Sequence, residues 1–197
     1  MLYLVIGVVP LYTCLRGSVN IGETIVTAQG SQLSFGSGRF VVWGELRLLG
    51  APPSNRRFPL VIDTGFNGFL ALRWEVIQEC LGLQLVEGLR LEGSDRSFKT
   101  NEYGAYLNTN YELYLSPSEV SNRSFRLASS NKIQVYLSKK LVESKGKFLS
   151  KDALTSWQSE KRPKVPLMGM NALRQSKVTL IVSNGNFVLS RWPWRKP

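Results

Sequence analysis

The chain has 197 residues, and its 43% apolar content is sufficient for a hydrophobic core. It contains no histidine, which excludes Ser-His-Asp and Cys-His catalytic sites and the zinc sites that need imidazole. The formal net charge of +11 would favour nucleic acid as a partner if it were spread over a motif-bearing surface. Cys14 and Cys80 lie far apart without CxxC spacing, so we expect no disulfide framework and a reducing, cytoplasmic location.

The first fifteen residues, MLYLVIGVVPLYTCL, are mainly apolar. They are fewer than the roughly 18 residues that a spanning helix needs, they include Pro10, and no basic region precedes them. We therefore expect a segment that does not span a membrane, with a signal peptide or a membrane anchor as the alternative. Residues 21–39 are rich in Gly, Ser and Thr without a sustained period, so we assign residues 1–38 to an N-terminal extension.

The folded domain is expected to begin at residue 39 with a β-hairpin. Two runs of β-branched and aromatic residues, Phe40–Leu49 and Phe58–Ile62, flank the turn sequence Gly-Ala-Pro-Pro-Ser-Asn. In Trp74–Leu81, apolar residues recur at spacings of three and four and a glycine follows, which predicts a short helix. Further strands are predicted at Leu89–Leu91, Tyr103–Leu107, Tyr111–Leu115 and Ile133–Leu137.

Basic residues are concentrated in residues 116–165, which hold 11 Lys or Arg against 4 acidic residues. We interpret this stretch as a basic insertion within a domain that covers residues 39–190, with one helical turn at Asp152–Gln158. A solvated basic loop is the first interpretation. Contact with RNA, DNA or another anionic surface is the alternative, so nucleic acid is a possible but not a favoured partner.

Order is expected to return near residue 166. The segment Val178–Leu189 predicts a second hairpin, because Ser183-Asn184-Gly185 at its centre contains Asn-Gly, a strong hairpin-turn signal. Residues 191–197 form a tail that mixes tryptophan with basic residues. Such a tail could stack on single-stranded nucleic acid, but we expect it to be disordered or packed in a dimer.

The residue that points to chemistry is Asp63, in Val-Ile-Asp-Thr-Gly. An apolar strand precedes it, so the carboxylate would leave the strand at a sharp turn, where Gly65 supplies backbone freedom. Taken with its strand alone, the triplet is equally well an ordinary strand-to-turn corner.

A second motif favours a catalytic role for Asp63 over an ordinary turn. Pro166–Leu173 joins two large apolar residues to a glycine and the start of a short helix. Together with Asp63–Leu70, it resembles the retropepsin-like (clan AA) aspartic proteases, and most closely their small bacterial single-motif members. These proteins carry Asp-Thr-Gly early and an apolar-apolar-Gly motif late. The resemblance covers about residues 40–115 and 165–190.

The resemblance implies a mostly β, closed domain with one or two short helices, active as a twofold homodimer. It also implies an aspartic endopeptidase that cleaves protein or peptide substrates with a water held between paired carboxylates, without metal or cofactor. The residues that it implies are catalytic Asp63, the active-site loop Thr64 and Gly65, the supporting loop Leu167, Met168 and Gly169, and a flap hairpin over Leu89–Leu107 with its tip at Gly93 and Ser94.

One chain supplies only half of such a site. The sequence contains three aspartates, and of Asp63, Asp95 and Asp152 only the first is followed by Thr-Gly. A homodimer is therefore required for activity, and twofold dimers are the commonest oligomers. The alternative from another class is a catalytically idle protease-like module that binds a partner or dimerises, with nucleic acid as one such partner.

Overall fold

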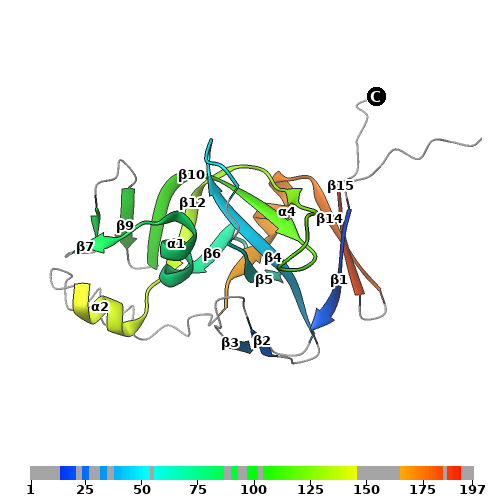
Figure 1. The fold of residues 1–197 in the computed structure, drawn as a ribbon, viewed down its shortest axis with the longest axis horizontal. Coiled ribbons are helices and arrows are strands. Elements are labelled where there is room, and N and C mark those ends of the chain that lie inside the picture. Colours follow the sequence, from blue (N-terminus) through cyan, green and yellow to red (C-terminus); the bar gives the residue numbers. More distant parts are fainter. Residues whose placement is uncertain are drawn as a thin grey trace, which may run out of the picture.

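A computed structural model of the chain describes residues 14–20, 24–26, 32–34, 38–53, 56–86, 90–92, 97–101, 104–145, 165–183 and 186–191. These residues are mostly in β-strands, with three short helices among them (Figure 1). The elements are β1 (Cys14–Asn20), β2 (Thr24–Val26), β3 (Gln32–Ser34), β4 (Arg39–Leu48), β5 (Phe58–Asp63), β6 (Leu70–Arg73), α1 (Trp74–Leu81), β7 (Leu85–Val86), β8 (Arg90–Leu91), β9 (Ser97–Asn101), β10 (Gly104–Ser116), β11 (Phe125–Arg126), β12 (Ser130–Tyr136), α2 (Lys139–Lys145), β13 (Leu167–Gly169), α4 (Met170–Gln175), β14 (Val178–Ser183) and β15 (Asn186–Arg191).

Six strands close into a barrel in the order β10, β12, β6, β13, β5 and β4. Closure comes from the antiparallel pairing of β10 with β4, which runs from Tyr111 opposite Leu48 to Ser116 opposite Trp43. The sheet continues from β4 through β1, β15 and β14, which stand beside the barrel in Figure 1. The expectation of a mostly β, closed domain is therefore confirmed.

The local patterns of the sequence account for several elements. Strands β4 and β5 form the predicted antiparallel hairpin, with Phe40 opposite Ile62. Helix α1 has the predicted bounds and ends at Gly82, whose φ of 66° is left-handed and whose N–H donates to the carbonyl oxygen of Gln78 at 2.9 Å. The β14–β15 hairpin is also confirmed.

The interior of the barrel holds alternate residues of its strands. Leu60, Leu107 and Met168 are fully buried there, and the ring of Phe69 meets that of Tyr111 edge to face at a centroid distance of 6.0 Å. Burial raises the pKa of the Tyr111 phenol, which donates a hydrogen bond to the carbonyl oxygen of Lys132 at 3.2 Å. The core thus lies directly behind the strands that carry the two sequence motifs.

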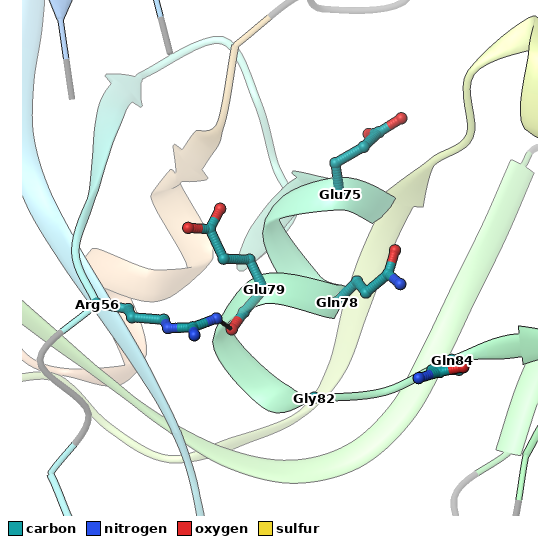
Figure 2. A pocket seen from close by; sticks show the side chains of 6 residues that line it. All are labelled: Arg56, Glu75, Gln78, Glu79, Gly82 and Gln84. Carbon is teal, nitrogen blue, oxygen red and sulfur yellow. Dashed lines mark hydrogen bonds between the residues drawn. The ribbon is translucent and has the colours of Figure 1, made fainter. Parts of the chain in front are cut away.

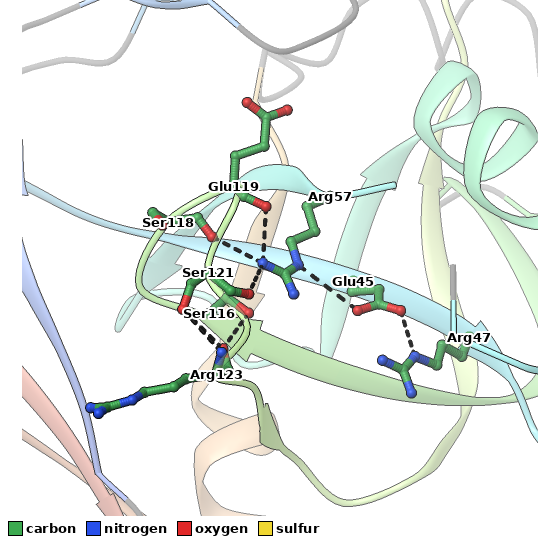
Figure 3. A network of polar contacts seen from close by, with 8 residues as sticks. All are labelled: Glu45, Arg47, Arg57, Ser116, Ser118, Glu119, Ser121 and Arg123. Atoms are coloured by element: carbon green, nitrogen blue, oxygen red, sulfur yellow. Dashed lines mark hydrogen bonds and ion pairs between the residues drawn. The ribbon is translucent and has the colours of Figure 1, made fainter. Parts of the chain in front are cut away.

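A buried carboxylate joins β4 to the loop after β10 (Figure 3). The side chain of Glu45 is 3% exposed and pairs with the guanidinium groups of Arg47 and Arg57. Arg57 in turn donates to the carbonyl oxygens of Ser118, Glu119 and Ser121. These hydrogen bonds hold the loop after β10 against β4 and β5. The hydrogen bond to Glu45 is also the main reason that the pKa of Arg47 is raised.

The basic stretch at residues 116–165 is not simply an insertion. Strand β12, inside this range, pairs with β10 on one side and with β6 on the other, so it is a wall of the barrel. Helix α2, also in the range, was not expected and raises the number of described helices to three, whereas the resemblance implies one or two. The two strands predicted at Tyr103–Leu107 and Tyr111–Leu115 are one long strand, β10.

The segment before residue 39 contributes to the sheet as well. Strand β1 pairs with β15 from Cys14 to Ser18 and with β4 at Val19 and Asn20, and Leu15 is buried. At the other end of the domain, Arg191 belongs to β15 rather than to a free tail. Within the described part of the chain, no helix is long and apolar enough to cross a membrane.

The predicted flap is only partly described. Its expected tip, Gly93 and Ser94, lies outside the described residues, as do the expectations for residues 1–13 and for the helical turn at residues 152–158. The strand pairing nearby differs from a single hairpin across residues 89–107, because β8 pairs with β7, whereas β9 pairs with β10 and Asn101 faces Gly104. A partner of the first residues of β10 is therefore β9, whereas β8 pairs with β7.

Candidate active site

Asp63 is the last residue of β5, at the point where the chain leaves the barrel wall. Its side chain is half-buried, whereas Thr64 and Gly65 are exposed. The N–H of Gly65 donates to Asp63 Oδ1 at 2.9 Å, and the N–H of Phe66 donates to the Asp63 carbonyl oxygen at 3.2 Å. The tight turn therefore fixes one carboxylate oxygen of Asp63 by a backbone hydrogen bond. The carboxylate lies beside the exposed residues Thr64 and Gly65.

Strand β13 lies between β5 and β6 and supports this turn. Its pairing with β5 is parallel and sets Gly169 level with Asp63. Gly169 donates its N–H to the carbonyl oxygen of Phe69 at 3.1 Å, and Met170 donates its N–H to that of Phe66 at 2.9 Å. Two backbone hydrogen bonds from the second motif thus tie down the loop at residues 63–69.

Gly169 is needed for this approach because no side chain fits there. A Cβ on Gly169 would lie against the carbonyl oxygens of Phe66 and Gly68 at distances that real Cβ atoms do not adopt. The apolar residues before it divide between the two faces of the strand. Met168 is fully buried in the barrel interior, whereas Leu167 belongs to a separate cluster on the other face.

That other face of the sheet is also the face of Asp63. Successive side chains of a strand alternate, so Val61 and Asp63 point to the same side of β5. Val61 forms a buried cluster with Leu167 of β13 and Ala71 of β6. Partly buried apolar side chains pack against this cluster, and they are Ile25, Val41, Phe66, Tyr136 and Val165. The carboxylate therefore stands at the edge of an apolar surface.

Within the described residues Asp63 takes part in no ion pair, and no group of three or more His, Cys, Asp or Glu side chains could hold a metal ion. A single carboxylate of this kind can accept a proton from water, but it cannot at the same time donate one to a carbonyl group. A second acidic group would be needed for both roles.

The structure brings together both predicted motifs, with Asp63, Thr64 and Gly65 on one side and Gly169 on the other. The apolar face beside them was missed from the sequence. Alternation along β4 could have indicated Val41, which faces Val61 in the hairpin. No sequence signal pointed to Ile25 or Tyr136, because only the closure of the barrel and the position of β2 place them here.

Comparison with known proteins gives no identification. No protein-family model, no curated protein and no solved structure matches the chain. The observation that bears on function is therefore the geometry of the two motifs.

A pocket elsewhere on the molecule is polar. It has a volume of about 430 Å³ and lies beside α1 (Figure 2). A guanidinium N–H of Arg56 donates to the carbonyl oxygen of Glu79 at 2.5 Å across its wall. The lining residues are Arg56, Glu75, Gln78, Glu79, Gly82 and Gln84. None of them belongs to the loop at residues 63–69, so this pocket is not part of the candidate site.

Proposed function

We propose that the chain is an aspartic endopeptidase whose active site forms when two copies bring their Asp63 carboxylates together. The observation that carries the proposal is the backbone contact between the two motifs, in which Gly169 lies level with Asp63 and holds its loop. The exposed Thr64 and Gly65 leave the outer side of that loop open to a second copy. A twofold axis at this point would supply the second carboxylate.

In the paired site one carboxylate is ionised and the other protonated, because two negative charges in contact are unfavourable. The ionised carboxylate takes a proton from water as the water oxygen attacks the peptide carbonyl carbon. The protonated one gives its proton to the carbonyl oxygen, which leaves a tetrahedral gem-diol. The C–N bond then breaks, the amine leaves with a proton, and one hydroxyl proton returns to the pair. No metal or cofactor takes part.

The proposal is tested with the purified full chain and a peptide library at pH values from acid to neutral, beside an Asp63→Asn variant. We expect cleavage by the wild type and none by the variant, since the amide keeps the size of the side chain and cannot carry the proton. The variant should keep its fold, which circular dichroism checks. Equal cleavage by the two proteins, or cleavage by neither, would overturn the proposal and leave a binding or dimerisation module as the better description.

A second readout needs no turnover. A statine-type inhibitor, which mimics the tetrahedral intermediate, should raise the melting temperature of the wild type, because a ligand that binds only the folded protein stabilises it. The Asp63→Asn variant should show a smaller rise. Inhibitor binding without any cleavage would favour the idle module over the enzyme.

A further inference from the structure

The β2–β3 hairpin stands apart from the sheet that bears Asp63. Its strands pair with each other, from Thr24 opposite Ser34 to Val26 opposite Gln32. Within the described residues no ladder joins either strand to the 11-stranded sheet, and Figure 1 shows the hairpin beside the barrel. A two-stranded hairpin is marginally stable by itself in water. Its position therefore depends on side-chain packing.

One described side chain makes that packing. Along β2 the burial alternates, with Thr24 and Val26 exposed and Ile25 half-buried between them. Ile25 packs against the cluster formed by Val61, Ala71 and Leu167, whereas Val26 is 57% exposed. The hairpin thus turns Ile25 toward the barrel and Val26 toward solvent.

The cluster under Ile25 is next to the carboxylate. Val61 precedes Asp63 by two residues on the same face of β5, which is a distance of about 7 Å along a strand. A peptide bond held at Asp63 carries side chains at a similar distance on either side. A side chain of a bound substrate would therefore reach the apolar surface that Ile25 covers.

We propose that the β2–β3 hairpin is a displaceable cover over the apolar face beside Asp63, and that Ile25 occupies the place of an aliphatic side chain of the substrate. That a peptide substrate displaces the hairpin rests on the proposed protease function. That the hairpin covers the apolar face does not depend on that function. The substrate binds only the open state, so the apparent KM is the intrinsic value divided by the open fraction. The turnover number of bound substrate is unaffected, because the cover has already moved.

Replacing Ile25 should shift the hairpin toward the open state. In Ile25→Asn the apolar contact is lost, and we expect KM for a peptide substrate to fall about tenfold at unchanged kcat, the factor that corresponds to partial burial of an isoleucine side chain. Ile25→Ala should give a smaller decrease. Val26→Asn is the matched control, because it makes the same kind of change on the exposed side of the same strand. Thermal melting checks that all three variants fold.

A dye whose fluorescence rises on apolar surfaces gives a readout that is independent of cleavage. Ile25→Asn should bind 1-anilinonaphthalene-8-sulfonate with higher fluorescence than the wild type and Val26→Asn, since the uncovered face is apolar. If neither the wild type nor the variants cleave peptides and the dye signal of Ile25→Asn still rises, the protease proposal is wrong. The proposal that the hairpin covers the apolar face would then still hold. Equal dye signals for Ile25→Asn and Val26→Asn, or an unchanged KM in Ile25→Asn, would overturn the cover.

Discussion

Gly169 lies level with Asp63 in the parallel pairing of β13 with β5, and its N–H donates to the carbonyl oxygen of Phe69 at 3.1 Å. The pairing of Gly169 with Asp63 joins residues more than 100 positions apart in the sequence. It leaves no room for a side chain on Gly169, because the carbonyl oxygens of Phe66 and Gly68 occupy that space.

The first prediction follows from this contact. Gly169→Ala should lower the free energy of unfolding by about 1–3 kcal/mol, the usual cost of overpacking, and should displace the loop that carries Asp63. Gly65→Ala makes the same change in the loop itself, where the nearest atom to the new Cβ is Asp63 Oδ1 at 3.3 Å. Urea unfolding should therefore show the smaller loss for Gly65→Ala. Equal losses would mean that the close approach at Gly169 is not a constraint.

Elements made of neighbouring residues could be predicted from the sequence. The β4–β5 hairpin and α1 follow from local periodicity and from the turn residues beside them. The position of β12 between β10 and β6 could not be predicted, because it depends on pairing between strands far apart in the chain. The sequence predicts a strand at Ile133–Leu137, but its basic and polar neighbours made residues 116–165 resemble an insertion outside the barrel, whereas Ile133 and Val135 are buried in the core.

In the candidate site too, some residues could be predicted from the sequence and others could not. Asp63 and Gly169 could be predicted because each lies in a short motif. The order and the residue types of the two motifs give the resemblance to a known family. The apolar face could not be predicted, because its members Ile25, Val41 and Tyr136 come from three separate strands. Strand alternation gives the side of a residue on its own strand, but only the barrel shows which strands are neighbours.

The second prediction concerns the buried network of Figure 3. Arg57→Ala leaves Glu45 with one guanidinium fewer and frees the carbonyl oxygens of the loop at residues 118–121. We expect a loss of about 2–3 kcal/mol in the free energy of unfolding, since the buried Glu45 carboxylate loses one of its partners and three part-buried carbonyl oxygens lose the Arg57 donor. Arg73→Ala is the control, because its ion pair with Glu75 is exposed and should be worth less than about 1 kcal/mol. Similar losses in urea unfolding would count against the network.

The third prediction concerns the thiol of Cys80. Burial raises its pKa from 9.0 to about 12, so the reactive thiolate is scarce in the folded protein at neutral pH. In a Cys14→Ser background, Cys80 should react slowly with a disulfide reagent at pH 8, and the rate should keep rising above pH 10. In urea the reaction should be fast at pH 8. Rapid reaction of the folded protein at pH 8 would contradict the raised pKa of this partly buried thiol.

The same shift has a consequence for stability. The folded-state pKa of Cys80 lies above the unfolded value of 9.0, so the unfolded chain releases its proton first. The contribution of this group is complete below pH 9 and is lost as the pH rises toward 12. A Cys80→Ala variant, compared with the wild type in urea unfolding, should show a weaker decrease of stability over this pH range.

The fourth prediction follows from the proposed pairing of two chains. Specific activity should fall when the protein is diluted through the range in which dimers dissociate, because each copy supplies one carboxylate. Sedimentation over the same concentrations should show the change from dimer to monomer. A monomer with full specific activity would rule out the shared site.

The most direct test mixes wild-type chains with Asp63→Asn chains in equal amounts and lets the subunits exchange. If both carboxylates of a pair are needed, only wild-type pairs are active, and random pairing gives about one quarter of the activity of the same total concentration of wild type. Sedimentation of each protein alone checks that the variant pairs as the wild type does. The account predicts this one-quarter value, and an activity of about one half would contradict it, because each Asp63 would then act alone.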